Sequence, residues 1–316
     1  MDIRIIKNRS DIGAGTRGSD LGIDAIEIAA INQGSNYFDR FPYTDVKTHN
    51  ESIYNKVRNS WAKRIGFVVE QCGRVSDAVK STINEGFFPI VLSGDHSSAL
   101  GTISGIKSAN PEKRLGVIWI DAHADLHSPY TSPSGNVHGM PLAAALGVDN
   151  LDFEINNVSE ESKGDWVAMK NIGVAGAKIA PEDLVYFGVR DTEDPENQLI
   201  SELNIRNYMV HELRYRGSEK CIQEAIQSLS KCEMIYISFD VDSLDCDLIS
   251  KGTGTPVSRG FDQYEVMEII KAFIQTKKVA CIELVEVNPL LDFKGNKMAA
   301  TAFEVLDDFT NNLLES

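Results

Sequence analysis

Short, continuously apolar runs separated by longer amphipathic stretches constrain the fold of this chain more than any other feature. The runs VIWI (117–120) and MIYISF (234–239) show no strict alternation of apolar and polar residues. Such runs are typical of parallel strands whose two faces are both covered by helices. The sequence predicts strands at Ile3–Ile6, Phe88–Leu92, Leu115–Asp121, Leu184–Val189, Met234–Asp242 and Val279–Val287.

Helical patterns lie between these strands, at Val75–Glu85, Ser97–Ala109, Ser218–Ser230 and Tyr264–Gln275. Alternation of strands and helices predicts an α/β fold, three layers deep (α/β/α), with a mainly parallel, doubly wound sheet. The chain has no repeat and no Pro/Ser-rich linker, so we expect a single domain over residues 1–316. The stretch Gly147–Asp183 has few apolar anchors, and we expect a solvated surface excursion, with a lid as the alternative.

The net charge of the chain limits the kinds of molecule that it is expected to bind. The 316 residues carry 31 Lys+Arg against 46 Asp+Glu, a formal net charge of -15. An excess of negative charge disfavours binding to nucleic acid or to an anionic membrane surface. It leaves small cationic molecules and divalent metals as natural ligands.

The N-terminal residues and the cysteines indicate in which cellular compartment the protein is expected. No apolar segment follows the charged first seven residues, and no stretch approaches 18 uninterrupted apolar residues. Neither a secretory signal nor a membrane span is therefore expected. The five cysteines are odd in number and include no C-x-x-C pair, which favours reduced thiols. We expect a cytoplasmic protein.

Three predicted strands end in unusual polar clusters. These are Ser93-Gly94-Asp95-His96-Ser97, then Asp121-Ala122-His123-Ala124-Asp125-Leu126-His127, and Asp240-Val241-Asp242. Ligands of doubly wound folds gather beyond the carboxyl ends of the strands. The clusters are therefore predicted to meet at one edge of the sheet.

The spacing within the clusters favours metal binding. Residues i, i+2 and i+4 of an extended segment point to one side, so Asp121, His123 and Asp125 are expected to converge. Four carboxylates brought together repel one another unless a cation joins them. A set of two histidines and four carboxylates without a thiolate suits manganese better than a structural zinc site. Carboxylates also bridge pairs of ions in two-metal hydrolases.

The alternative for each acid taken singly is helix capping, and for Asp95 capping is the better interpretation. For the three clusters together, no capping rule requires the pattern D-x-H-x-D.

These residues resemble a known family. The segments SGDHS, DAHADLHSPYTSPSGNVHG, SFDVDSLD, GTGTP and ELVEVNP are similar, in order, to the signatures of the ureohydrolase (arginase–agmatinase) family, from about Gly94 to Pro289. Within that family, TSPSGNVHG (131–139) is similar to the arginases. The resemblance implies an arginase-like fold and hydrolysis of L-arginine to L-ornithine and urea by a metal-bridging hydroxide.

The resemblance also implies two Mn²⁺ ions per subunit and assigns their ligands. One ion would be held by His96, Asp121, Asp125 and Asp240, and the other by Asp121, His123, Asp240 and Asp242. Asp121 and Asp240 would bridge the ions, and Asp125 would also orient the hydroxide. A homo-oligomer, a trimer or a hexamer, is implied as well.

Further site residues follow from the same resemblance. His138 corresponds to a proton shuttle, and Glu286 to the acid that pairs with the substrate guanidinium. Three residues of the loop after His127, namely Ser132, Ser134 and Asn136, correspond to a site for the substrate α-carboxylate; an ordinary polar turn is the alternative. Glu193 aligns with an acid that contacts the α-amino group.

Two departures leave the substrate open. His127 stands where arginases commonly have Asn, and Glu193 where they usually have Asp. Another guanidino compound, such as agmatine or guanidinobutyrate, is therefore an alternative substrate. A one-metal deacetylase-like enzyme and a non-catalytic metal-binding regulatory protein on the same scaffold are further alternatives.

The segment Gly13-Ala14-Gly15-Thr16-Arg17-Gly18 fits G-x-G-x-x-G, the pattern of dinucleotide-binding turns. Six residues separate it from the preceding predicted strand, so the turn is not immediate. We interpret it as a flexible loop near the mouth of the site.

Overall fold

The protein is described by a computed structural model, which covers residues 1–57 and 59–316. Within these residues, eight strands form one sheet in which every neighbouring pair is parallel. The strands are β1 (Ile3–Asn8), β2 (Tyr43–Asp45), β3 (Phe88–Ser93), β4 (Leu115–Ile120), β5 (Leu184–Phe187), β6 (Arg206–Tyr208), β7 (Met234–Asp240) and β8 (Val279–Val285). The helices are α1 (Gly22–Asn32), α2 (Tyr37–Arg40), α3 (Ile65–Asn84), α4 (Ala99–Ala109), α5 (Pro141–Leu146), α6 (Glu160–Lys170), α7 (Asp194–Glu202), α8 (Val210–Arg216), α9 (Ser218–Ser228), α10 (Gln263–Ile274) and α11 (Lys297–Glu315).

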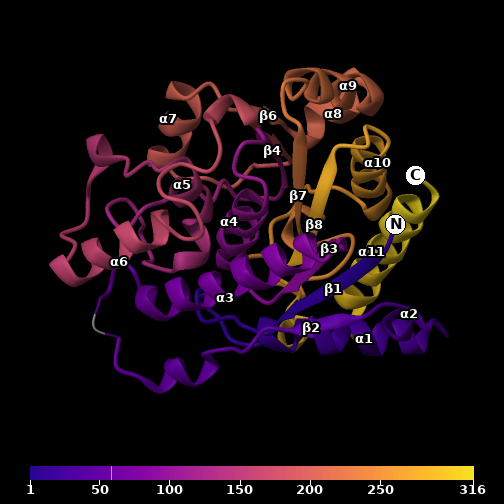
Figure 1. Cartoon of the computed structure of the whole chain (residues 1–316), viewed down its shortest axis with the longest axis horizontal. Helices are drawn as coiled ribbons and strands as arrows, with labels where there is room; N and C mark the ends of the chain where they lie inside the picture. The colour runs from indigo at the N-terminus through magenta and orange to yellow at the C-terminus, as the bar shows by residue number, and fades with distance from the viewer. Residues whose placement is uncertain (58) are drawn as a thin grey trace.

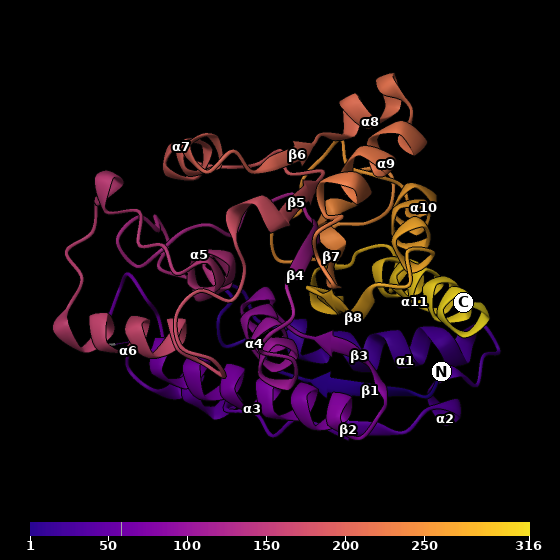
Figure 2. The ribbon, with the colours of Figure 1, turned by 45° about the horizontal axis from the view of Figure 1, so that its top comes forward.

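Helices cover both faces of the sheet, which confirms the predicted three-layer α/β/α architecture (Figures 1 and 2). Successive residues of each strand feed different layers, because side chains alternate across a strand. In β4, Ile118 and Ile120 belong to the core shared with α1, α10 and α11. Val117 and Trp119 belong to the core shared with α3, α4 and α5. This double burial explains the continuously apolar runs.

The strand order is β2-β1-β3-β8-β7-β4-β5-β6. All six predicted strands are present, and most end two residues or fewer before the predicted limit. The prediction omitted the strands β2 and β6 at the two edges of the sheet. Each contains three residues, too few for a periodic pattern.

The predicted helices are present as α3, α4, α9 and α10, and α3 begins ten residues before the predicted Val75. The prediction of a solvated loop over Gly147–Asp183 is wrong. This stretch contains α6, whose Trp166 and Met169 are buried in the core shared with α3. Trp166 and Met169 are three positions apart and therefore lie on the same face of the helix, where they anchor the segment. The many acidic residues of the segment do not indicate this buried face.

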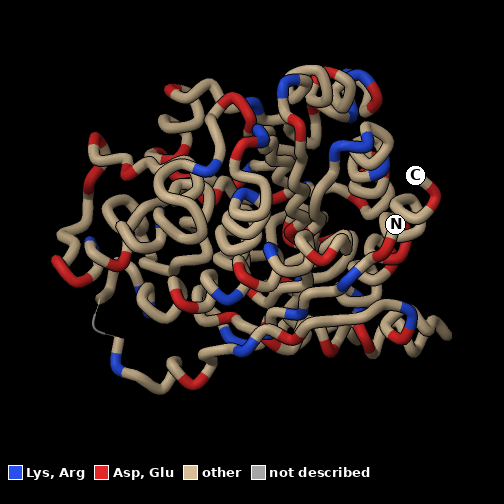
Figure 3. The backbone as a smooth tube through the Cα atoms, viewed as in Figure 1, with Lys and Arg blue, Asp and Glu red and all other residues tan. Residues whose placement is uncertain are grey.

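Acidic and basic residues lie along the whole chain rather than in one segment (Figure 3). No helix in the described part of the chain combines the length and the apolar character that crossing a membrane would require.

Candidate metal centre and substrate pocket

The four central strands β3, β8, β7 and β4 are consecutive neighbours in the sheet. Each is followed directly by polar residues: His96 after β3, Glu286 after β8, Asp240 and Asp242 at the end of β7, and the 121–127 segment after β4. The carboxyl ends of parallel strands lie at one edge. Residues far apart in the sequence therefore meet there, and the predicted clusters do come together.

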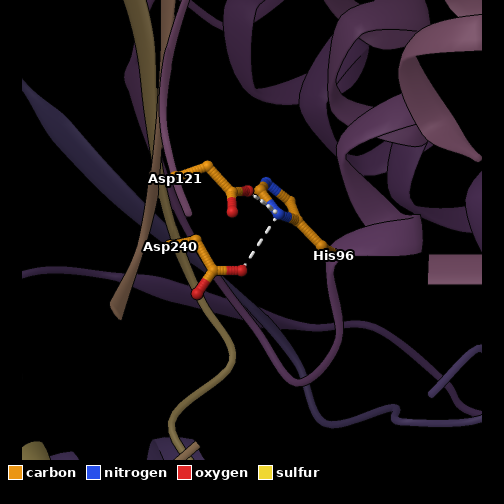
Figure 4. A group of neighbouring side chains, drawn as sticks. All are labelled: His96, Asp121 and Asp240. Atoms are coloured by element: carbon orange, nitrogen blue, oxygen red, sulfur yellow. Dashed lines mark ion pairs between the residues drawn. The ribbon is translucent and has the colours of Figure 1, made fainter. Parts of the chain in front are cut away.

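His96, Asp121 and Asp240 form a first group of possible metal ligands (Figure 4). The Nδ1 atom of His96 is 3.0 Å from an oxygen of Asp121, 3.2 Å from one of Asp125 and 3.1 Å from one of Asp240. Among the described residues, neither this nitrogen nor the Oδ2 atom of Asp121 has a partner with hydrogen-bond geometry. Ligand atoms that converge without bonding one another are the arrangement a metal ion requires.

Asp121, His123 and Asp242 form the second group. His123 Nδ1 lies 2.9 Å from Asp242 Oδ2 and 3.5 Å from Asp121 Oδ1. Thr255 donates a hydrogen bond of 3.0 Å to the same oxygen of Asp242. Asp121 belongs to both groups, so a shared ligand between two ions is geometrically available.

The prediction that extended backbone makes these side chains converge is wrong. The strand β4 ends at Ile120, and Asp125 has a φ of 50°, in the left-handed region. Asp242 lies in a short 3₁₀ turn, where its N–H donates to the side chain of Asp240. Tight turns at the strand ends, rather than the strand period, therefore aim these carboxylates at one point.

The buried carboxylates of the centre destabilise one another's charged form. Burial, followed by the charges of Asp242 and Asp121, raises the pKa of Asp240 well above its ordinary value. Burial and the charge of Asp121 likewise raise the pKa of Asp125. Buried carboxylates that repel one another become stable when they share divalent ions. The oxygen-rich donor set thus fits a metal centre.

His138 and Glu286 form a pair beside this centre. His138 Nδ1 is 3.1 Å from Glu286 Oε1, which also accepts a bond of 2.9 Å from the His96 N–H. Burial opposes protonation, but the hydrogen bond and charge of Glu286 raise the pKa of His138 to about 9. Glu286 has a φ of 68°, and its buried Oε2 has no hydrogen-bond partner among the described residues. A buried free carboxylate oxygen next to a polar pocket is suited to a cationic ligand.

A pocket of about 280 Å³ opens over the centre. It is lined by the metal-centre residues His96, His123, Asp125, Asp240 and Asp242, by His138 and Glu286, and by His127, Ser132, Ser134, Asn136 and Glu193. Every predicted site residue except the buried Asp121 therefore lines one cavity. A larger cavity of about 520 Å³ lies apart from these residues and is lined by residues within 55–57, 59–70 and 161–165.

His127 is held firmly at the pocket wall. Its Nε2 lies 3.0 Å from Glu193 Oε2 and its Nδ1 3.1 Å from Thr131 Oγ1. The sequence analysis missed Glu196, whose Oε2 is 3.5 Å from His127 Nε2 and which lines the same pocket. Glu193 is the N-cap of α7 and Glu196 lies three residues later, so the two form a capping box. This spacing in the sequence could have indicated that Glu196 lies close to Glu193. Asp95 caps the turn at His96, as predicted.

The glycine-rich segment at 13–18 packs beside the site. Gly13 donates a backbone hydrogen bond of 2.8 Å to Asp95, and its carbonyl accepts one of 3.2 Å from the His138 N–H. A Cβ at Gly13 would overlap Ser97, and one at Gly18 would overlap Asn288. These glycines permit close packing around the metal-centre loops, which accounts for them without a nucleotide.

Comparison with known proteins agrees with this geometry. The model of the Arginase family matches residues 1–310. An arginase of Bacillus subtilis (strain 168) is 34% identical over 317 residues, which cover 99% of this chain and 98% of that protein. The native structure of an arginase from Bacillus caldovelox has a TM-score of 0.83 at 32% identity, covering 100% of this chain and 98% of that one. A formimidoylglutamase from Bacillus subtilis shares the fold, with a TM-score of 0.73 at 20% identity. This chain belongs to the arginase family.

Proposed function

We propose that this protein hydrolyses the guanidinium group of L-arginine, giving L-ornithine and urea. Family membership and full-length similarity to arginases support the reaction. The observation that carries the proposal is the placement of His96 Nδ1 within 3.2 Å of three buried carboxylates that it does not bond. Ligand atoms placed in this way could hold a metal ion, which the proposed reaction requires.

The proposed cofactor is a pair of Mn²⁺ ions. His96, Asp121, Asp125 and Asp240 would hold one ion, and Asp121, His123, Asp240 and Asp242 the other. Six nitrogen- and oxygen-bearing side chains without a thiolate favour Mn²⁺ over a structural Zn²⁺. Bound divalent ions lower the pKa of water and so supply a nucleophile near neutral pH.

The chain itself positions the substrate and moves the proton. Glu286 Oε2 would pair with the planar guanidinium, leaving its carbon facing the metal centre. Glu286 Oε1 fixes His138 through Nδ1, so Nε2 is the nitrogen free to exchange a proton. When water adds to the guanidinium carbon and the C–N bond to the ornithine side chain breaks, His138 would deliver a proton to the leaving amine. Asp125 would accept a hydrogen bond from the attacking water.

The amino-acid end of arginine would occupy the outer pocket. Ser132, Ser134 and Asn136 would receive the α-carboxylate, and Glu193 the α-amino group. His127 lies between these two regions, hydrogen-bonded to Glu193. We propose in addition that residues 1–316 act as one catalytic domain, in a cytoplasmic homo-oligomer, a trimer or a hexamer.

The test is urea release by the purified, manganese-loaded protein from L-arginine, agmatine and guanidinobutyrate, with the metal content measured in parallel. We expect a clear preference for arginine and about two metal ions per chain. Preference for agmatine or guanidinobutyrate would contradict the substrate, and one ion per chain would favour the deacetylase-like alternative.

A matched variant separates catalysis from simple metal binding. His123→Asn removes a ligand of the second group only, so we expect weaker binding of one ion and a steep loss of turnover. If His123→Asn retains full activity, the two-metal mechanism fails. If the unaltered, loaded protein releases no urea from any guanidino compound, the non-catalytic alternative holds.

A further inference from the structure

The substrate pocket is strongly acidic. Its lining includes seven carboxylates and no Lys or Arg among the described residues; the acids are Asp125, Asp191, Glu193, Glu196, Asp240, Asp242 and Glu286. Such a field attracts the guanidinium and amino groups of arginine but repels its carboxylate. The proposed metal ions would compensate Asp125, Asp240 and Asp242, which leaves Asp191, Glu193, Glu196 and Glu286. A positive group of the chain near the carboxylate end would offset the repulsion from these four acids.

Lys63 lies directly behind the pocket wall. Its Nζ donates a hydrogen bond of 3.2 Å to Oδ1 of the pocket-lining Asn136. Its backbone N–H also donates one of 2.8 Å to the carbonyl of Gly135. Gly135 packs so closely on Ser60 that a Cβ there would overlap the Ser60 carbonyl. Residues 60–63 and the loop 132–136 are therefore docked as one unit, which holds the ammonium in place.

This contact fixes the orientation of the Asn136 amide. An ammonium group only donates, so the amide oxygen must face Lys63 and the NH₂ group must point elsewhere. The amide nitrogen lies against Gly15, where any Cβ would overlap it. Lys63 therefore contacts the amide oxygen of Asn136 and does not consume the NH₂ donors, and Gly15, without a Cβ, leaves room for the NH₂ group.

The hydroxyl groups of the two loop serines, Ser132 and Ser134, are also available to donate hydrogen bonds. Ser132 Oγ accepts a hydrogen bond of 2.9 Å from the Gly135 N–H, and Ser134 Oγ accepts one of 3.2 Å from the Asn136 N–H. A hydroxyl that accepts from the backbone keeps its own hydrogen for another partner. The loop thus presents hydroxyl and amide donors with a cation behind them, which is the chemistry that recognises a carboxylate.

We propose that Lys63 is a specificity-determining, positioning residue, which orients Asn136 and supplies positive charge to the carboxylate end of the pocket. The inference rests on the proposed function and names its substrate class: guanidino compounds that carry a carboxylate. None of the ion pairs in the described part of the chain includes Lys63.

The test compares Lys63→Met and Lys63→Arg with a matched control, Lys80→Met, at an exposed site on α3. For Lys63→Met we expect KM for arginine to rise about tenfold and kcat to change less than about twofold, because only a charged hydrogen-bond network at the far end is lost. Lys63→Arg should restore most of the affinity, and Lys80→Met should match the unaltered enzyme.

A binding measurement separates the charge effect from general damage. L-Ornithine and 1,4-diaminobutane differ only in the carboxylate, so Lys63→Met should weaken inhibition by ornithine about tenfold and leave inhibition by the diamine unchanged. Equal weakening of both, a fall in kcat with an unchanged KM, or no change at all would overturn the proposal. Lys63→Gln, which is one atom shorter and keeps a donor without the charge, tests the charge effect by the same comparison if Lys63→Met does not fold.

Failure of the proposed function would be recognised separately. If the unaltered enzyme releases no urea from arginine, the reaction is wrong, yet calorimetric binding of ornithine to the unaltered and Lys63→Met proteins still decides the role of Lys63. If urea is released and the Lys63 variants bind ornithine normally, only the role of Lys63 is wrong.

Discussion

The imidazole of His96 lies flat on the indole of Trp119, with ring centroids 4.0 Å apart and an interplanar angle of 4°. Its Nε2 is 2.7 Å from Ser238 Oγ, on the neighbouring strand β7. One face and one edge of the ring are therefore held, and Nδ1 remains directed at the carboxylates. Partners of this kind fix the orientation of metal-binding histidines.

Ser238→Ala should consequently weaken metal binding by about 10- to 100-fold, because the ring loses its second fixed contact. The change removes one hydroxyl, so the melting temperature of the chelator-treated protein should shift little. Competition with a fluorescent chelator measures the affinity. Ser104→Ala, a buried serine on α4 outside the pocket, is the control and should bind metal normally. Equal affinity of both variants would contradict this account.

Removing metal should destabilise the fold. Asp121, Asp125, Asp240 and Asp242 are all buried, and divalent cations would reduce their mutual repulsion. An ion present at 100 times its dissociation constant stabilises the folded state by about 2.7 kcal/mol. We expect EDTA to lower the melting temperature by several degrees and Mn²⁺ to restore it. In Asp242→Ala the shift should be smaller, and an equal shift would place the stabilising ion elsewhere.

The His138–Glu286 pair should make the stability of the chelator-treated protein depend on pH. The folded-state pKa of His138 is raised from 6.5 to about 9, so protonation is favoured by folding. The resulting stabilisation is fully present below pH 6.5 and is lost as the pH rises through about 9. Its upper limit is on the order of 3 kcal/mol. Denaturant unfolding between pH 6 and 10 measures the slope, which His138→Asn should reduce.

The cysteines should resist thiol reagents in the folded protein. All five described cysteines are free and buried. Burial, with a contribution from Asp183, raises the pKa of Cys232 to about 12, so little of it is thiolate at pH 8. We expect slow labelling by a thiol reagent in buffer and five equivalents in denaturant. Rapid labelling of one cysteine before unfolding would contradict the packing described above.

Sequence patterns predicted the central strands because both faces of each strand are buried, which leaves an unbroken apolar run. They predicted the polar clusters because these follow the same runs. Patterns could not reveal Lys63, since its contact with Asn136 joins residues 73 positions apart. Nor could they show that Asp125 turns through a positive φ to reach His96. Both relationships depend on how separate loops pack, which residue spacing does not encode.

The position of β8 affects how the protein is made. This strand is the last in the sequence, yet it lies between β3 and β7 in the middle of the sheet. A nascent chain would emerge from the ribosome with a gap between these two strands until residues 279–285 are available. This edge of the sheet would therefore be completed only after β8 has been synthesised, in a slow, long-range pairing step. Metal loading should accordingly follow the insertion of β8 between β3 and β7 rather than guide it.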